Sequence, residues 1–260
     1  MPPNGTSMVD RTYLDLAAEL LAPAKQAGLA ASAWPGARVL DVGSGGGADA
    51  VALAEVVGSA GTVDGIDADP FMVAAANMAA TAAGVAERVQ HKLSRADRIP
   101  FADDRFDVAR AERVLQHCDD PARVVAEMVR VVRPGGRLVL VDTDWASVSM
   151  SCLDPVVERD IARLLLTAVP RPTVGRELGH VLRAAGCLIE DIRPHLIASR
   201  DVELIRLITR LPQFQAAAVR DGALAAATDD AWQASCEQLA GAGAFLGYAV
   251  ITVAIGTVAP

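Results

Sequence analysis

The chain has 260 residues, of which 52% are hydrophobic and 22% are charged, and its net charge at pH 7 is −8. This composition excludes a disordered chain and allows a sizeable buried core, in one large domain or two small ones. The excess of acidic residues argues against a general affinity for nucleic acid or for an anionic membrane surface.

The sequence gives no sign of secretion, membrane insertion or a metal site. Residues 1–8 lack the charged and apolar regions of a signal peptide, and the apolar run at 245–258 is too short to span a bilayer. The four cysteines are far apart, with no Cys-x-x-Cys pair and no His-Glu-x-x-His motif. We therefore expect a cytoplasmic protein with reduced thiols and no metal.

The first regular elements surround a glycine-rich loop. Residues 9–31 have a helical apolar pattern that we expect Pro23 to break. Residues 39–42 are a short apolar run typical of a central parallel strand, and five residues with four glycines follow. The alanine-rich residues 48–57 then predict a helix whose N-terminus faces a ligand on this loop.

The middle of the chain alternates between strands and helices. We expect strands at 62–67, 89–93, 106–109 and 137–141, and helices at 71–83 and 122–132. This alternation predicts a doubly wound, mostly parallel sheet. In such sheets the ligand lies at the carboxyl ends of the strands.

The remaining residues are less regular. They predict helices at 155–168 and 174–185, a strand at 187–198, an alanine-rich helical segment at 201–243 interrupted at Pro212, and a last strand at 245–258. We expect one domain over residues 1–260, divided into an N-terminal helical cap (1–37), a ligand-binding core (38–145), helices with a sixth strand (146–200), a helical lid insertion (201–243) and the last strand (244–258).

Two classes of ligand fit the glycine loop. The spacing Gly43-x-Gly45-x-x-Ala48, with Asp67 further along, also matches a dinucleotide fingerprint and favours an NAD-dependent oxidoreductase. However, Asp41 lies two residues before the first glycine. A carboxylate at that position repels a pyrophosphate and suits a ligand that carries an ammonium group.

Several further motifs occur in a fixed order along the chain. They are Leu40-Asp41-Val42-Gly43-Ser44-Gly45-Gly46-Gly47, Gly65-Ile66-Asp67, Ile99-Pro100-Phe101, Phe106-Asp107-Val108 and Arg133-Pro134-Gly135-Gly136-Arg137-Leu138. In this order and spacing they resemble the class I S-adenosylmethionine-dependent methyltransferases, specifically the small-molecule group. The resemblance covers roughly residues 39–145 and implies a seven-stranded Rossmann-like sheet with an antiparallel last strand.

The resemblance also implies a role for individual residues in holding S-adenosylmethionine. Asp67 would accept both ribose hydroxyls. Met72 would either pack on the adenine or belong to the core, and Arg95 occupies the position where the family commonly has an acid, so Asp97 or the backbone of Ala96 is the expected substitute. The full set of expected cofactor residues is Asp41, Gly43, Ser44, Gly45, Gly47, Asp67, Ala68, Met72, Ala96, Asp97 and Ala111.

Methyl transfer from a sulfonium is an in-line displacement that depends on alignment and on exclusion of water. His117 follows the fourth strand and is the candidate catalytic base, with ordering of its loop as the alternative role. Trp145 either stacks on a substrate or covers the sheet. The expected substrate-binding residues are Tyr13, Arg113, Gln116, Trp145 and Trp232.

We therefore expect an enzyme that transfers a methyl group to an O, N or C atom of a small organic molecule such as a secondary metabolite, with S-adenosylhomocysteine as the product. One alternative is a methyltransferase-fold cyclase that acts on a polyketide-type substrate without net methyl transfer. A lesser alternative is the NAD-dependent oxidoreductase. We expect no nucleic-acid or membrane partner, and a homodimer is one candidate assembly.

Overall fold

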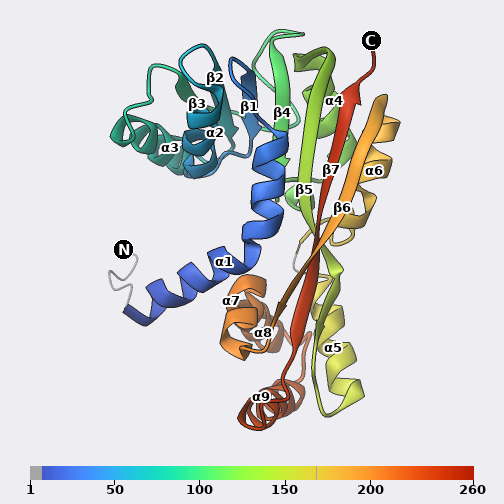
Figure 1. Ribbon diagram of the computed structural model, residues 1–260. Helices are drawn as coiled ribbons and strands as arrows, with labels where there is room; N and C mark the ends of the chain where they lie inside the picture. Colours follow the sequence, from blue (N-terminus) through green and yellow to red (C-terminus); the bar gives the residue numbers. More distant parts are fainter. Residues whose placement is uncertain (1–7, 168) are drawn as a thin grey trace.

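The computed structural model describes residues 8–167 and 169–260. Its seven strands form one sheet in the order β3-β2-β1-β4-β5-β7-β6 (Figure 1). β1 to β5 pair in parallel, and β7 lies antiparallel between β5 and β6, so the predicted sheet is confirmed. The strands are β1 (Arg38–Val42), β2 (Thr62–Asp67), β3 (Val89–Leu93), β4 (Phe106–Glu112), β5 (Val132–Met150), β6 (Cys187–Ser199) and β7 (Gly247–Val258).

Several helices begin at an aspartate that caps the first turn. Asp69, Asp120 and Asp154 each accept a backbone N–H of the first helical turn, and proline follows each of them. No helix within the described residues is long and apolar enough to span a membrane. The helices are α1 (Met8–Ala31), α2 (Ala48–Val57), α3 (Pro70–Ala82), the 3-10 helix η1 (Leu115–His117), α4 (Pro121–Val131), α5 (Pro155–Leu165), α6 (Val174–Ala184), α7 (Val202–Thr209), α8 (Leu211–Arg220) and α9 (Ala226–Gly241).

The parallel part of the sheet is covered on both faces, as its apolar strands predict. Successive residues of β1 point to opposite faces, so that Leu40 packs in one cluster with α4 and α6, whereas Val39 packs in another with α2 and α3. α1 lies across β5, β6 and β7. These layers bury the centre of the sheet and leave the carboxyl ends of β1, β2 and β4 free for a site.

The expected break of the first helix at Pro23 is wrong. α1 runs from Met8 to Ala31 with Pro23 inside it. The helix changes direction along its length (Figure 1). A proline removes one backbone hydrogen bond and commonly bends a helix without ending it, which accounts for this geometry.

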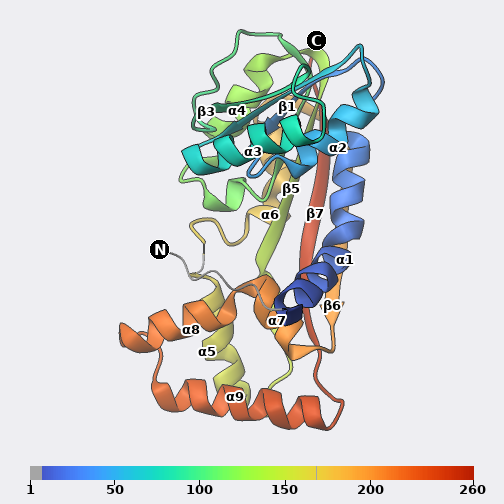
Figure 2. The same cartoon turned by 90° about the vertical axis from the view of Figure 1, so that its left-hand side faces the viewer.

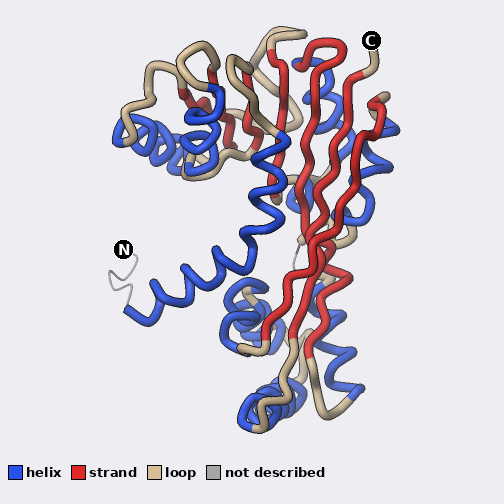
Figure 3. The backbone as a smooth tube through the Cα atoms, viewed as in Figure 1, coloured by secondary structure: helices blue, strands red, loops and turns tan. Residues whose placement is uncertain are grey.

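Three strands extend far beyond the parallel sheet. β5 was expected at 137–141 but spans Val132–Met150, because its polar residues after Val141 pair with β7 across an irregular register. Figure 3 shows β5, β6 and β7 continuing into the lower part of the molecule, and Figure 2 shows α5, α7, α8 and α9 gathered there. Residues 201–243 are thus three helices that share a core of their own with α5 and these strands, including the buried Trp232.

An ion-paired carboxylate ties three strands together at the edge opposite the carboxyl ends. Asp107, at the start of β4, accepts the backbone N–H of Arg38 at 2.8 Å and the Arg133 Nε–H at 2.7 Å. Partial burial raises the pKa of Asp107, but the hydrogen bonds from Arg38 and Arg133 outweigh this and lower it from 3.8 to about 2.

We expect D107N to lower the free energy of unfolding by about 1 kcal/mol near neutral pH, since the ion pairs are only partly buried. The folded-state pKa of Asp107 is depressed, so its contribution is complete above pH 3.8 and is lost as the pH falls through about 2. Denaturant unfolding of both proteins across this window measures the effect. If the difference in free energy of unfolding between D107N and the parent protein does not shrink at low pH, the predicted role of Asp107 is contradicted.

Candidate functional site

The loop after β1 is held closely against β2 and α3. Gly43 has φ 70° and Gly47 has φ 81°, both in the left-handed region that favours glycine. A Cβ on Gly43 would lie 2.4 Å from a methyl carbon of Val114, and one on Gly47 would lie 2.8 Å from the Cβ of Ala76. Side chains are therefore excluded at both positions by the backbone conformation and by close packing.

Asp67 ends β2 and faces this loop. Its Oδ2 accepts the backbone N–H of Gly45 and its Oδ1 accepts the backbone N–H of Asp69, both at 2.9 Å. These two bonds fix the orientation of the carboxylate. Each oxygen keeps acceptor capacity for a ligand, since an ionised carboxylate offers about four lone-pair positions.

A cavity of about 420 Å³ opens beside Asp67. Of the predicted cofactor residues, the structure brings Gly43, Asp67, Ala68, Ala96 and Asp97 to its wall. The predicted substrate residue Arg113 and the candidate base His117 also lie there. Arg95, which the sequence placed at the family's acidic position, is on the wall with its side chain paired to Asp97. The residues that the sequence did not single out are Ile66, Ser94, Val114, Cys118, Asp119, Asp120 and Val124.

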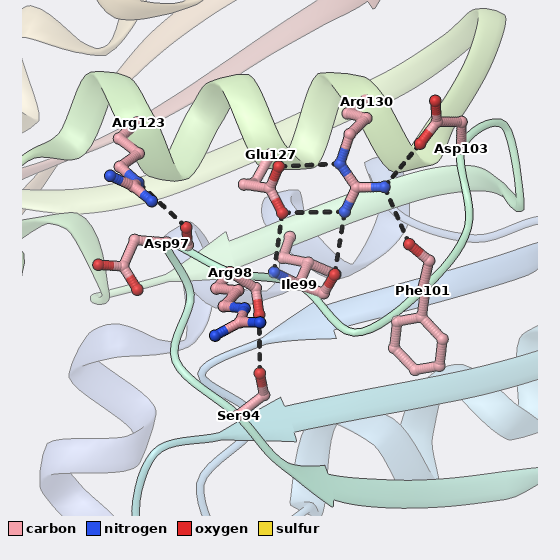
Figure 4. Close-up of polar contacts among 9 residues, drawn as sticks. All are labelled: Ser94, Asp97, Arg98, Ile99, Phe101, Asp103, Arg123, Glu127 and Arg130. Atoms are coloured by element: carbon pink, nitrogen blue, oxygen red, sulfur yellow. Dashed lines mark hydrogen bonds and ion pairs between the residues drawn. The ribbon is translucent and has the colours of Figure 1, made fainter.

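The loop that carries Ala96 and Asp97 is anchored to α4 (Figure 4). Arg130 of α4 donates to the backbone oxygens of Ile99 and Phe101, both at 2.9 Å. Glu127 of α4 accepts the N–H of Ile99 at 2.9 Å and also receives two hydrogen bonds from Arg130. This side of the cavity is therefore fixed by the side chains of Glu127 and Arg130 of α4.

The other predicted cofactor residues do not line this cavity. Ser44 and Ala111 are buried, and Gly45 contributes its N–H to Asp67. Gly47 packs against α3, while the side chain of Met72 on α3 is 43% exposed and lies outside the wall.

Asp41 is also absent from the cavity wall, because it is 2% exposed and is paired with Arg110 of β4. The Arg110 guanidinium, itself 1% exposed, contacts Asp41 at 3.1 Å, Asp49 at 2.9 Å and Glu112 at 2.5 Å. Burial raises the pKa of Asp41 to about 6, against the lowering effect of Arg110. The sequence did not single out Arg110, although a charged residue within an apolar strand was the available signal.

The Arg110 cluster joins four elements of the site. Asp41 ends β1, Asp49 lies in the first turn of α2, and Arg110 and Glu112 lie on β4. Lys25 of α1 adds an ion pair to Asp49 at 2.6 Å. Three carboxylates thus face two cations, which leaves one negative charge beside the glycine loop.

A second cavity of about 620 Å³ adjoins the first, since Arg113 and His117 line both. The structure brings the predicted substrate residues Arg113, Gln116 and Trp145 to its wall. Most of the remaining wall is apolar. It consists of Leu21, Val148, Val169, Ile197, Ile208, Phe214, Ala249 and Ile251, with Glu112, Thr143, Thr209 and Arg210 as the polar members.

Two predicted substrate residues are not brought to this wall. Trp232 lies elsewhere, because its side chain is 1% exposed and packs in the core that α5 shares with α7, α8 and α9. An aromatic residue in an amphipathic segment is compatible with a pocket or with a core, and here Trp232 belongs to the core. The side chain of Tyr13 lies outside the described part of the structure.

Hydrogen bonds define the protonation state of His117. The Trp145 Nε1–H donates to Gln116 Oε1 at 2.7 Å, so the amide nitrogen of Gln116 faces His117 Nε2 at 3.0 Å. An amide nitrogen only donates, so His117 Nε2 accepts and the neutral ring carries its proton on Nδ1. Burial, with the nearby Arg113 and Arg210, lowers the pKa of His117, which favours this neutral form.

Asp142 holds the short helix that carries these residues. One carboxylate oxygen accepts the backbone N–H groups of Leu115 at 2.9 Å and Gln116 at 3.3 Å, and the other accepts that of Thr143 at 3.1 Å. Burial raises the pKa of Asp142 to about 7, against the lowering effect of these bonds. β5 therefore positions Gln116 and His117 through a single side chain.

We expect R110M to destabilise the fold by about 3 to 5 kcal/mol at about pH 8, because it leaves buried carboxylates unpaired. The loss should be smaller at about pH 5, where the raised pKa of Asp41 lets this carboxyl bind a proton. Urea unfolding at both pH values measures the two losses.

R163M is a matched control, since Arg163 pairs with Asp160 at the surface at 3.6 Å. It should cost less than about 1 kcal/mol at either pH. A loss in R110M that equals the control, or that does not grow with pH, would show that the buried cluster contributes little.

Comparison with known proteins supports the resemblance to the methyltransferases. Residues 40–140 match the family model described as a methyltransferase domain. The chain is 34% identical over 204 residues to an uncharacterised 37.1 kDa protein in transposon TN4556 of Streptomyces fradiae, which covers 78% of the chain and 58% of that protein. It is 32% identical over 172 residues to the methyltransferase GfsG of Streptomyces halstedii, with 66% of the chain and 55% of that protein covered. The chain thus spans less than two thirds of the length of these relatives.

Two solved structures share the fold. The YcgJ protein of Bacillus subtilis has a TM-score of 0.63 at 23% identity, and the alignment covers 91% of this chain and 98% of that one. The [4+2]-cyclase SpnF has a TM-score of 0.53 at 25% identity, with 97% and 84% covered. The match at residues 40–140 includes the glycine loop and Asp67, and it identifies S-adenosylmethionine as the cofactor instead of NAD. Residues 40–140 therefore form a domain of the class I S-adenosylmethionine-dependent methyltransferase family.

Proposed function

We propose that this protein transfers a methyl group from S-adenosylmethionine to an O, N or C atom of a small organic molecule, such as a secondary metabolite. The observation that carries the proposal is the meeting of two cavities at Arg113 and His117. One cavity has the carboxylates that suit the cofactor, and the other has an apolar wall that suits an organic acceptor.

The residues of the smaller cavity fit the charge and shape of S-adenosylmethionine. The cofactor carries a sulfonium, an ammonium and a carboxylate, so its net charge is positive. Asp67, Asp97, Asp119 and Asp120 on the wall provide acceptors and negative charge, with Arg95 held in a pair with Asp97. The oriented carboxylate of Asp67 would hold the ribose hydroxyls.

The uncompensated charge of the Arg110 cluster supports a binding place for the ammonium group. One oxygen of Asp41, Oδ2, is buried without a hydrogen-bond partner among the described residues. Glu112 of the same cluster lines the larger cavity and a neighbouring one of about 250 Å³. We therefore assign the methionine end to the region between the glycine loop and Glu112, with Asp41 acting through its charge.

When bound, the cofactor supplies an electrophilic methyl group. The protein's own contribution is to place an acceptor atom in line with that group and to keep water away. His117 stands where the two cavities meet, and its Nδ1–H can donate to an acceptor molecule. Its Nε2 is engaged by Gln116, so we assign His117 to orienting the acceptor, and a role as general base would require the release of Nε2.

The function is tested by incubating the purified protein with methyl-labelled S-adenosylmethionine and a panel of aromatic and polyketide-type acceptors. We expect label in an organic product together with S-adenosylhomocysteine. Absence of cofactor binding by calorimetry would contradict the proposal.

Cyclisation in the same scaffold is a second candidate function, favoured by the similarity to SpnF over 97% of this chain. The two reactions differ in the mass of the product. An isomer of unchanged mass, formed without consumption of the cofactor, would support cyclisation over methyl transfer.

We expect D67A to weaken the binding of S-adenosylhomocysteine about 10- to 100-fold, because hydrogen bonds to a charged acceptor are lost. D69N is the control, since Asp69 caps α3 without lining the cavity and asparagine also caps helices. Calorimetry of both variants measures the effect. If D67A binds as tightly as D69N, Asp67 does not hold the ribose.

Replacements of His117 distinguish an orienting donor from a base. The amide nitrogen of asparagine reaches the place of Nδ1, so H117N should keep methyl transfer within about tenfold of the parent, whereas H117A should lose about 100-fold. Initial rates with an acceptor identified in the panel measure this difference. Equal loss in both variants, with the acidic limb of the pH profile abolished, would establish His117 as a base.

A further inference from the structure

Two arginines at the larger cavity have an unusual backbone conformation. Within the described residues, positive φ outside glycine occurs at Asp104, Arg113 and Arg210, and the two arginines have φ 54° and 53°. Aspartate adopts this region fairly often, but it is uncommon for a bulky residue. Both arginines line the same 620 Å³ cavity.

The fold holds this conformation at both places. The backbone N–H of Arg113 donates to Val141 O at 2.7 Å, directly after β4. Arg210 joins α7 to α8, and its N–H donates to Leu207 O at 3.3 Å. Glycine would adopt these angles at no steric cost, so the presence of arginine at both indicates a use for the side chains.

Neither guanidinium forms an ion pair within the described part of the protein. The ion pairs within 4.0 Å found there do not include Arg113 or Arg210. By contrast, Arg206 of α7 pairs with Glu203 at 2.6 Å. The acid on the cavity wall, Glu112, is already held by Arg110 at 2.5 Å. Two positive charges therefore line this cavity without an ion-pair partner within 4.0 Å among the described residues.

The two arginines also act on a common neighbour. Both line the larger cavity together with His117, whose pKa is lowered by burial and by the charges of these two arginines. The rest of the wall is mainly apolar, with Val148, Ile208, Phe214 and Ile251 among its members. The cavity thus has an apolar body and a cationic end.

We propose that Arg113 and Arg210 form an anion-binding site in the larger cavity, and that the molecule bound there is apolar with one anionic oxygen group, a carboxylate or a phosphate. The planar guanidinium matches such groups through paired N–H donors. This inference rests on the proposed function, since it names the class of molecule that receives the methyl group.

The anionic group serves as the anchor. A carboxylate that accepts hydrogen bonds from two guanidinium groups has its lone pairs engaged and is a weaker nucleophile than a free one. Methyl transfer would therefore occur at another atom of the anchored molecule, held by the anion at one end and by the apolar wall along its body.

The test compares three ligands that share a naphthalene body and differ in the polar group. Calorimetry with the full chain, saturated with S-adenosylhomocysteine, measures the binding of 2-naphthoate, 2-naphthyl phosphate and neutral 2-naphthamide. We expect at least one anion to bind about tenfold more tightly than the amide, as a charge-assisted hydrogen-bonded pair provides. The anion that binds more tightly shows whether the anchor is a carboxylate or a phosphate.

Variants show whether the arginines cause this preference. R113G and R210G remove the charge while allowing the left-handed backbone, so their folding is not threatened by strain. Either change should reduce the preference for the anion to less than about threefold and leave the affinity for the amide unchanged. R220Q is the matched control, because Arg220 on α8 pairs with Asp221 away from the cavity.

Several results would overturn the inference. Equal binding of the anions and the amide by the parent protein would do so, as would an intact preference in R113G and R210G. If R113G mainly weakens S-adenosylhomocysteine and keeps the preference, Arg113 belongs to the cofactor and the paired site is wrong. Failure of the parent to bind S-adenosylhomocysteine at all is a separate result, which contradicts the proposed function instead.

Discussion

The buried guanidinium of Arg110 is the contact on which the site depends most. It bonds the end of β1, the first turn of α2 and the end of β4, and through Asp49 it reaches Lys25 of α1. A charged group this deeply buried is stable only when its partners surround it. The same requirement fixes the carboxyl ends of β1 and β4 relative to each other, and it places a surplus negative charge beside the glycine loop.

The two cavities that meet at Arg113 and His117 have opposite electrostatic character. The smaller one is rich in carboxylates and suits a cationic cofactor, whereas the larger one presents two unpaired arginines to an apolar space. Opposite charge on the two sides would help to place each molecule in its own compartment. The small helix between them, capped by Asp142, positions the residues at the boundary.

The sheet and its strand types could be predicted because they follow from local patterns. Apolar strand runs, the glycine loop and Asp67 carry their information in adjacent residues. The larger cavity could not be assembled in this way, since Arg113 follows β4 whereas Arg210 lies between two helices of the insertion, and only packing brings them together. Packing likewise places Trp232 in the core of the helices, and the role of Arg110 depends on partners from β1 and α2 as well as from its own strand.

The most direct test of the account is a crystal structure of the protein with S-adenosylhomocysteine. We expect the ribose on the Asp67 carboxylate, the adenine beside Ala96 and Asp97, and the sulfur at the junction formed by Arg113 and His117, open to the larger cavity. A ligand bound elsewhere, or with its sulfur facing away from that cavity, would contradict the account.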